Sequence, residues 1–204
     1  MDIVERFINY TKINTTTSRE NGAKGIMPSS PGQMKLAKLL VSELEALGME
    51  DIILRENAIV TATLPANTDE TIPVVSFFGH LDTSAEQTAD TKAQRLPYNG
   101  GDLCLNPELN IYLRESEFPE LKNYIGDDLI VTDGTSLLGA DDKAALAAIM
   151  NALQFLISHP EIRHGRAGVT GGQSLRCFRV WRRFWLHSGL LRYWRICLRK
   201  LECG

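Results

Sequence analysis

The sequence has few cysteines and no long hydrophobic run, and each shortage excludes a class of protein. Only one of the four cysteines, Cys104, falls within residues 1–165. That part of the chain therefore has no disulfide framework, and a reducing, cytoplasmic environment is expected. No apolar run reaches the roughly 18 residues that a membrane-spanning helix needs. Residues 1–6 are acidic and lack the apolar segment of a secretory signal.

Acidic residues are almost absent from the end of the chain. Residues 1–165 contain 24 Asp and Glu against 13 Lys and Arg, whereas residues 166–204 contain one acid and nine bases. All three tryptophans and three of the four cysteines also lie in residues 166–204. The chain therefore divides into an acidic segment, 1–165, and a basic, aromatic tail, 166–204.

The acidic segment contains patterns of helices and strands. Two predicted helices flank a polar stretch near the N-terminus, strands follow them, and a third helix comes late in the segment. Helices are predicted over residues 2–12, 31–47 and 141–158, and strands over 51–55, 58–64, 74–78 and 129–132. Residues 13–29 are predicted to form an exposed loop, and residues 86–122 an irregular segment. Strands that alternate with helices predict an α/β fold with a mixed sheet flanked by helices.

A possible metal site begins where the strand at 74–78 ends. Gly79 is followed by His80 and, two positions on, by Asp82. Side chains two apart on an extended chain point to the same side, so these two are expected to face one site. Imidazole is a common metal ligand, and a nearby carboxylate fixes its tautomer. An ordinary polar loop is the alternative for this pair.

A second acidic motif lies about sixty residues further along, where Asp141 and Asp142 precede the predicted helix. One Asp would serve to cap that helix, because its oxygens accept from the first amides. Two adjacent carboxylates, in a chain that also has His80 and Asp82, fit a site that offers several anionic ligands to a divalent cation.

These motifs carry a resemblance to a known family. Gly79-His80-Leu81-Asp82-Thr83 and Gly139-Ala140-Asp141-Asp142-Lys143-Ala144 resemble the first two metal-site motifs of the dinuclear zinc peptidases related to carboxypeptidase G and the aminoacylases. Residues 4–10, 27–33 and 98–102 are similar to the tripeptide aminopeptidases of that family. The resemblance covers about residues 1–165, so it implies a truncated, N-terminal part of a zinc-peptidase catalytic domain.

The resemblance implies two zinc ions per complete site and a role for three residues. His80 resembles a ligand of one zinc, and Asp141 resembles the carboxylate that bridges both. Asp82 resembles the carboxylate that orients His80 and is counted as catalytic. Two close metal ions lower the pKa of bound water and polarise a peptide carbonyl. The implied activity is release of the N-terminal residue of tripeptides in the cytoplasm, with no nucleic-acid or membrane partner, and with a homodimer only in the full-length enzyme.

The family pattern also requires a Glu-Glu pair after the next strand, then a later Asp and a distal His. After Asp142 the only acids are Glu161 and Glu202, which are far apart. We therefore expect the metal site to be incomplete and the chain to be inactive. A shift of reading frame near Gly165 would account for both the missing residues and the composition of the tail.

Two other functions stay open. Arginines and aromatic residues recur at near-helical spacing in residues 166–204, as in a basic helix that binds an anionic membrane or nucleic acid without catalysis. A related aminoacylase or dipeptidase would carry the same two motifs as a tripeptide aminopeptidase.

Overall fold

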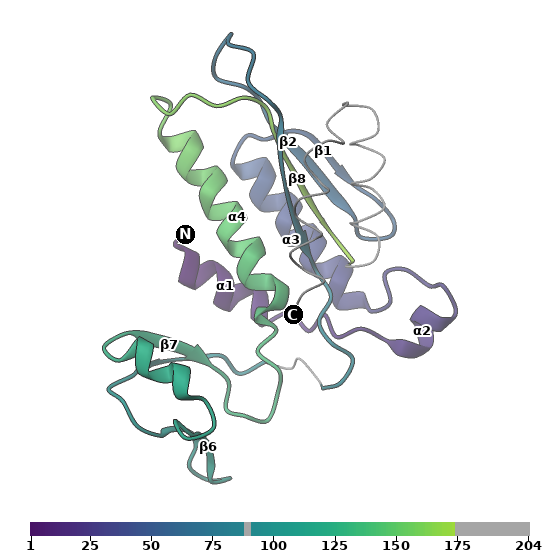
Figure 1. Cartoon of the computed structure of the whole chain (residues 1–204). Helices are drawn as coiled ribbons and strands as arrows, with labels where there is room; N and C mark the ends of the chain where they lie inside the picture. Colours follow the sequence, from purple (N-terminus) through teal and green to yellow (C-terminus); the bar gives the residue numbers. More distant parts are fainter. Residues whose placement is uncertain (88–90, 174–204) are drawn as a thin grey trace, which may run out of the picture.

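The computed structural model describes residues 1–87 and 91–173, and these form a sheet with helices packed against it (Figure 1). The predictions that concern residues 174–204, including the basic helix, lie outside the described residues. None of the helices in the described ranges is both long and apolar enough to cross a membrane.

The three predicted helices are confirmed. They are α1 (Ile3–Thr11), α3 (Pro31–Ala46) and α4 (Ala140–Ser158). Helix α1 begins at Asp2, whose carboxylate accepts from the backbone N–H of Glu5 at 2.8 Å. Helix α3 begins with a proline in its first turn, where the missing N–H costs nothing. Local capping chemistry therefore fixes where both helices start.

The main sheet is mixed, as predicted. It contains β1 (Glu50–Leu54), β2 (Val60–Leu64), β3 (Val75–His80) and β8 (Ala167–Gly172) in the order β1-β2-β8-β3. Strand β2 runs antiparallel to both β1 and β8, whereas β8 runs parallel to β3 and places Gly172 opposite His80. The carboxyl ends of β3 and β8 therefore lie side by side.

Strand β8 lies just beyond residue 165, where the sequence interpretation placed the start of the basic tail. It pairs along its whole length with β2 on one side and with β3 on the other, and Ala167 and Val169 are buried. Residues 167–172 are thus part of the same sheet as β1, β2 and β3. Averaged composition missed the strand because its six residues are small and uncharged and fill the narrow space between two neighbours.

The prediction of an exposed loop over residues 13–29 is wrong at both ends of the stretch, whereas residues 22–26 are exposed. This stretch contains a short helix, α2 (Arg19–Ala23), and its residues Ile13, Thr15 and Ser29 are buried. Polar composition was misleading because backbone groups of the stretch pair with the loop that follows β3, so polar side chains come to lie inside the domain.

The predicted irregular segment carries short elements of its own. They are β4 (Gln94–Pro97), β5 (Leu103–Asn106), β6 (Ile111–Leu113) and the 3₁₀ helix η1 (Pro119–Tyr124). Strand β4 pairs with the predicted strand β7 (Asp128–Val131), and β5 pairs with β6. These two small sheets lie apart from the main sheet (Figure 1).

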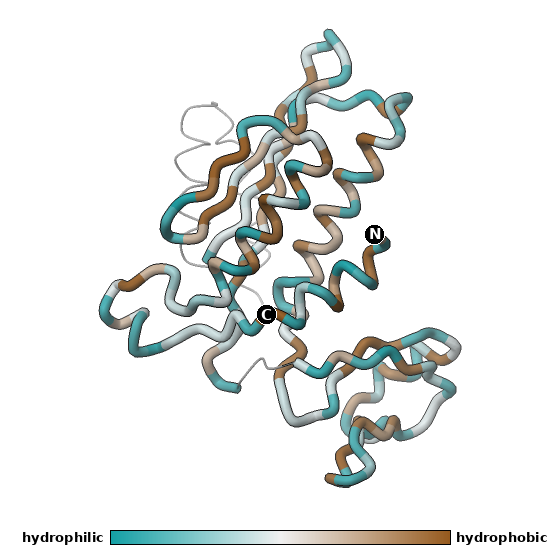
Figure 2. Tube along the Cα trace, turned by 180° about the vertical axis from the view of Figure 1, so that it is seen from behind, coloured by the Kyte–Doolittle hydropathy of each residue, from teal (hydrophilic) through white to brown (hydrophobic). Residues whose placement is uncertain are grey.

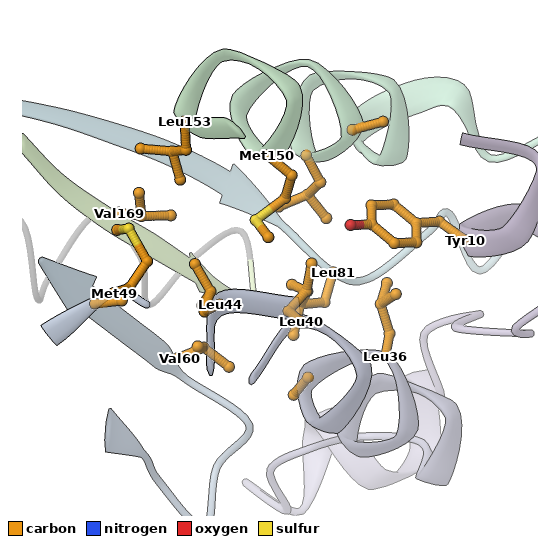
Figure 3. Packing of buried hydrophobic residues seen from close by; sticks show 14 of the residues in the cluster. Tyr10, Leu36, Leu40, Leu44, Met49, Val60, Leu81, Met150, Leu153 and Val169 are labelled. Carbon is orange, nitrogen blue, oxygen red and sulfur yellow. The ribbon is translucent and has the colours of Figure 1, made fainter. Parts of the chain in front are cut away.

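The hydrophobic core lies between the main sheet and helices α1, α3 and α4 (Figure 3). Hydrophobic residues recur along the strands and the facing helices, while the turns are largely hydrophilic (Figure 2). Helix α4 approaches the end of β3 closely at Gly79, where an added Cβ would lie 2.5 Å from Leu146 Cδ2. Glycine therefore permits the contact that brings the two predicted motifs together.

Candidate metal-binding site

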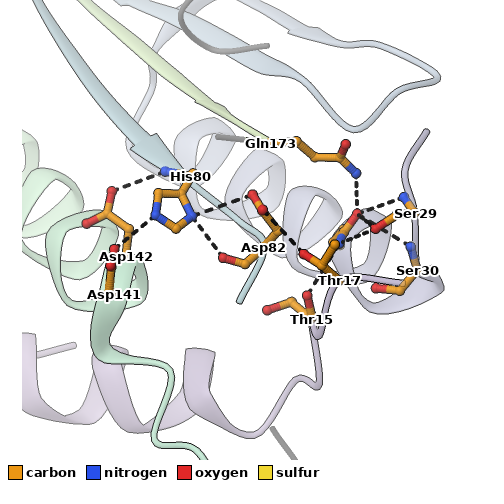
Figure 4. A network of polar contacts seen from close by, with 10 residues as sticks. Thr15, Thr17, Ser29, Ser30, His80, Asp82, Asp141, Asp142 and Gln173 are labelled. Carbon is orange, nitrogen blue, oxygen red and sulfur yellow. Dashed lines mark hydrogen bonds and ion pairs between the residues drawn. The ribbon is translucent and has the colours of Figure 1, made fainter. Parts of the chain in front are cut away.

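The end of β3 and the start of α4 bring two of the predicted residues into direct contact (Figure 4). His80 Nε2 lies 2.9 Å from Asp141 Oδ1. The side chain of Asp141 is 94% exposed, whereas that of His80 is 25% exposed. An imidazole nitrogen and an accessible carboxylate thus lie in contact at the carboxyl end of β3.

Asp82 lies on the other side of the His80 ring. His80 Nδ1 is 2.8 Å from the backbone carbonyl oxygen of Asp82 and 3.5 Å from its carboxylate oxygen Oδ1. Because a carbonyl oxygen only accepts, Nδ1 carries a hydrogen and donates it. The side chains of His80 and Asp82 thus lie next to each other, although the shorter contact is made by the backbone of Asp82.

Asp142 does not cap α4. Its Oδ2 accepts from the backbone N–H of His80 at 3.1 Å, and the N-cap position is taken by Gly139 with φ of 71°. The backbone angles of Asp141 and Asp142 are not helical, so regular helix begins only after them. Asp142 therefore supplies an acceptor to the backbone at the end of β3, which is a supporting role for His80 and not a helix cap.

The surrounding carboxylates favour a charged imidazole. The hydrogen bond with Asp82 is the largest cause that raises the pKa of His80 to about 9; partial burial opposes it, and Asp141 and Asp142 add to it. Burial raises the pKa of Asp142 in turn. Because a metal ligand must be the neutral imidazole, a cation would have to displace the proton that faces Asp141.

The donor set fits part of a metal site. Imidazole nitrogen and carboxylate oxygen are both zinc ligands, and Nε2 is the nitrogen left available once Nδ1 donates to Asp82. Zinc takes at least three protein ligands, and within residues 1–87 and 91–173 no group of three or more His, Cys, Asp or Glu side chains is arranged to hold a metal ion. Strand β8 ends beside His80 with Gly172 and Gln173, neither of which supplies a carboxylate.

Residues 13–17, which the sequence interpretation placed in a loop, contact the segment that carries Asp82. The backbone of Thr83 donates to Thr15 O at 3.2 Å and accepts from the N–H of Thr17 at 3.0 Å. The hydroxyl of Thr17 also contacts Asp82 Oδ2 at 3.4 Å. No local signal distinguishes these threonines from an ordinary polar loop, because their partner lies more than sixty residues away.

Lys143 is completely buried directly after the two aspartates, and this burial predicts a dependence of stability on pH. Burial lowers its pKa from 10.5 to about 8. Below pH 8 the Lys143 side chain is charged in both the folded and the unfolded chain, so burial of the ammonium group lowers the free energy of unfolding by its full cost, roughly 3 kcal/mol. Between pH 8 and 10.5 the unfolded chain binds the extra proton, so the stability contributed by this group rises with pH.

We expect the unfolding free energy of the wild type, relative to that of Lys143→Met, to increase by roughly 2 kcal/mol between pH 7.5 and pH 10. Urea denaturation followed by circular dichroism measures both proteins, and the subtraction cancels every other titrating group. A difference that stays constant across this range would mean that Lys143 titrates normally in the folded chain.

No protein-family model matches the chain, but individual relatives do. Peptidase T from Geobacillus kaustophilus is 50% identical over 170 residues, which cover 82% of this chain and 41% of the relative. Peptidase T from Parabacteroides distasonis is also 50% identical over 170 residues, which cover 83% of this chain and 41% of the relative. The chain therefore spans about two fifths of the length of the curated relatives that it matches.

Two solved structures share the fold. Aminopeptidase PepT from Bacillus cereus aligns with a TM-score of 0.53 at 21% identity, covering 83% of this chain and 35% of that one. A tripeptidase from Staphylococcus aureus aligns with a TM-score of 0.50 at 20% identity and the same two coverages. These structures confirm the mixed α/β fold, and the relatives named Peptidase T confirm the resemblance found in the sequence. Over about four fifths of its length, this chain is a homologue of peptidase T and corresponds to about two fifths of that protein.

Proposed function

We propose that the described residues are part of the catalytic domain of a zinc-dependent aminopeptidase that releases the N-terminal residue of tripeptides. The observation that carries this proposal is the meeting of His80, Asp82 and Asp141 at the adjoining ends of β3 and α4. It occurs in a chain that is 50% identical to peptidase T over 170 residues. The geometry thus supports the same three residues that the resemblance singled out.

Each residue has a distinct role in this proposal. His80 would hold one zinc through Nε2, and the exposed carboxylate of Asp141 would hold the same ion and bridge to a second. Asp82 contacts the His80 ring on the Nδ1 side, which would keep Nε2 available to hold the zinc. When bound, zinc supplies Lewis-acid polarisation of the scissile peptide carbonyl.

The site requires groups beyond the described residues. A general base is expected after β8, and Gln173 at that position cannot accept a proton from water as a carboxylate does. We therefore propose that the 204-residue chain is inactive and that peptide catabolism, like any homodimer, belongs to the full-length enzyme. The free thiol of Cys104 is compatible with the proposed cytoplasmic location.

The test is a chimera in which residues 1–172 of this chain replace the matching part of peptidase T from Geobacillus kaustophilus. We expect the chimera to remove the N-terminal residue of tripeptides, with activity lost on chelation and regained with zinc. His80→Ala is expected to lower kcat/KM at least about 100-fold. Chromatography of the released amino acid measures the rate, and the 204-residue chain assayed beside it should give none.

His159→Ala is the matched control, because His159 is half exposed at the far end of α4, where it pairs with Glu161 and its ring lies beside that of Phe155. This variant should retain the activity of the chimera. A folded chimera that cleaves no tripeptide, or whose activity survives both chelation and His80→Ala, would contradict the proposal. Cleavage of dipeptides or N-acyl amino acids in preference to tripeptides would instead favour a related dipeptidase or aminoacylase.

A further inference from the structure

Lys143 is buried without a carboxylate partner in the described part of the chain, which is an expensive arrangement for an ammonium group. Its Nζ donates to the backbone carbonyl of Ile13 at 2.7 Å. The side chain runs beneath Gly139, where an added Cβ would lie 3.8 Å from Lys143 Cδ and 3.0 Å from Thr83 Cγ2. A lysine thus joins the start of α4 to the segment that begins at Ile13.

That segment leads directly to one side of the His80 ring. The backbone N–H of Thr83 donates to Thr15 O, and the backbone carbonyl of Thr83 accepts from the N–H of Thr17. The Thr17 hydroxyl contacts the Asp82 carboxylate. The carbonyl of Asp82 in turn accepts from His80 Nδ1. The position of Asp82 therefore depends on where residues 13–17 lie.

The start of α4 contacts the His80 residue on the side opposite Asp82. Asp142 accepts from the backbone N–H of His80, and Asp141 contacts Nε2. Since Lys143 follows these two aspartates directly and binds Ile13, one side chain connects both halves of the support around His80. Removing its donor would let residues 13–17 and the turn at 139–142 shift independently.

We propose that Lys143 is a positioning residue of the candidate site, which fixes the orientation of the His80 imidazole by locking residues 13–17 to the start of α4. The significance for catalysis rests on the proposed function, whereas the contacts themselves are independent of it. Lys143 touches neither substrate nor metal in this proposal. It acts through Ile13 and Thr17 on Asp82, and through Asp141 and Asp142 on His80.

The test is nuclear magnetic resonance of the metal-free, ¹⁵N-histidine-labelled 204-residue chain at pH 7. The His80 ring should show hydrogen-bonded N–H resonances shifted downfield, one for Nδ1 and one for Nε2. Lys143→Met, which keeps an unbranched side chain one heavy atom shorter and removes the donor, should abolish the downfield Nδ1–H resonance and shift the ring nitrogens. These signals are assigned by their loss in His80→Ala.

Arg6→Met is the matched control because Arg6 is the other buried cation in the described residues and lies away from the site, between α1, α3 and α4. It should lower stability and leave the His80 resonances in place. Resonances that are unchanged in folded Lys143→Met would overturn the proposal and leave Lys143 a packing residue.

If Lys143→Met does not fold, Thr17→Val decides the matter. This variant keeps the shape of the side chain and removes the contact with Asp82. A shifted His80 Nδ1–H resonance supports the chain of contacts from Lys143 to the ring, and an unchanged one overturns it. Because the readout needs neither metal nor turnover, these results stand apart from those of the chimera.

Discussion

Replacing Glu43 by alanine is expected to lower the free energy of unfolding by about 3–5 kcal/mol. The Glu43 carboxylate accepts from Arg6 Nε at 2.8 Å and from the Tyr10 hydroxyl at 3.1 Å, and Arg6 is only 4% exposed. Arg6 also donates to Gln154 Oε1 at 2.8 Å, so the network ties α1 and α3 to α4. Without Glu43, a buried guanidinium would lose its counter-charge while retaining one neutral acceptor.

Urea denaturation of Glu43→Ala beside Glu45→Ala measures this effect. Glu45 lies two residues further along the same helix and is exposed, so its removal should change stability by no more than about 0.5 kcal/mol. The double variant Arg6→Met/Glu43→Leu should recover most of the loss, because it removes both charges together. Equal midpoints for the two single variants would show that the buried ion pair contributes nothing.

Gly32→Ala is the second substitution with a large expected effect, roughly 3 kcal/mol of lost stability. A Cβ on Gly32 would lie 1.6 Å from the backbone oxygen of Asn14 and 2.7 Å from its carbonyl carbon. Neither atom belongs to a flexible side chain, so residues 13–17 would have to move away from α3. That movement would also break the hydrogen bond from Gln33 Nε2 to Thr15 O, now 3.3 Å.

Gly22→Ala provides the comparison, because Gly22 lies in α2 and an added Cβ there meets nothing within 4 Å. Alanine is favoured over glycine in a helix by up to about 1 kcal/mol, so this variant should match or slightly exceed the wild type in stability. Thermal denaturation of the two variants distinguishes a steric effect at Gly32 from a general effect of glycine removal. A Gly32→Ala protein as stable as Gly22→Ala would rule out the close approach at Asn14.

Local chemistry made the main elements predictable. Asp2 and the Ser-Pro-x-Gln sequence at residues 30–33 mark the starts of α1 and α3, and the apolar run before Gly79 marks β3. The same reasoning placed His80 and Asp82 on one side of an extended chain, and the structure has them in contact. These features depend on residues that are close in sequence, so the sequence alone was sufficient.

What could not be predicted depends on partners that are distant in sequence. Strand β8 consists of small residues whose strand character comes from the two neighbours on either side of it. Thr15 and Thr17 are polar and locally typical of a loop, yet they support Asp82 through Thr83. Lys143 follows two acids at the start of a helix, and no local pattern indicates a carbonyl partner that is 130 residues away.

The strand order β1-β2-β8-β3 has a consequence for the order of events during synthesis. In the described part of the chain, β8 is the only strand that pairs with β3, and it joins β3 to the hairpin of β1 and β2. Because β8 is the last of the four to leave the ribosome, helices α1, α3 and α4 are all made before the sheet is continuous. Strand β3 and the hairpin therefore cannot join in one sheet until residues 167–172 have emerged, and a sheet completed by segments so distant in sequence is expected to form slowly.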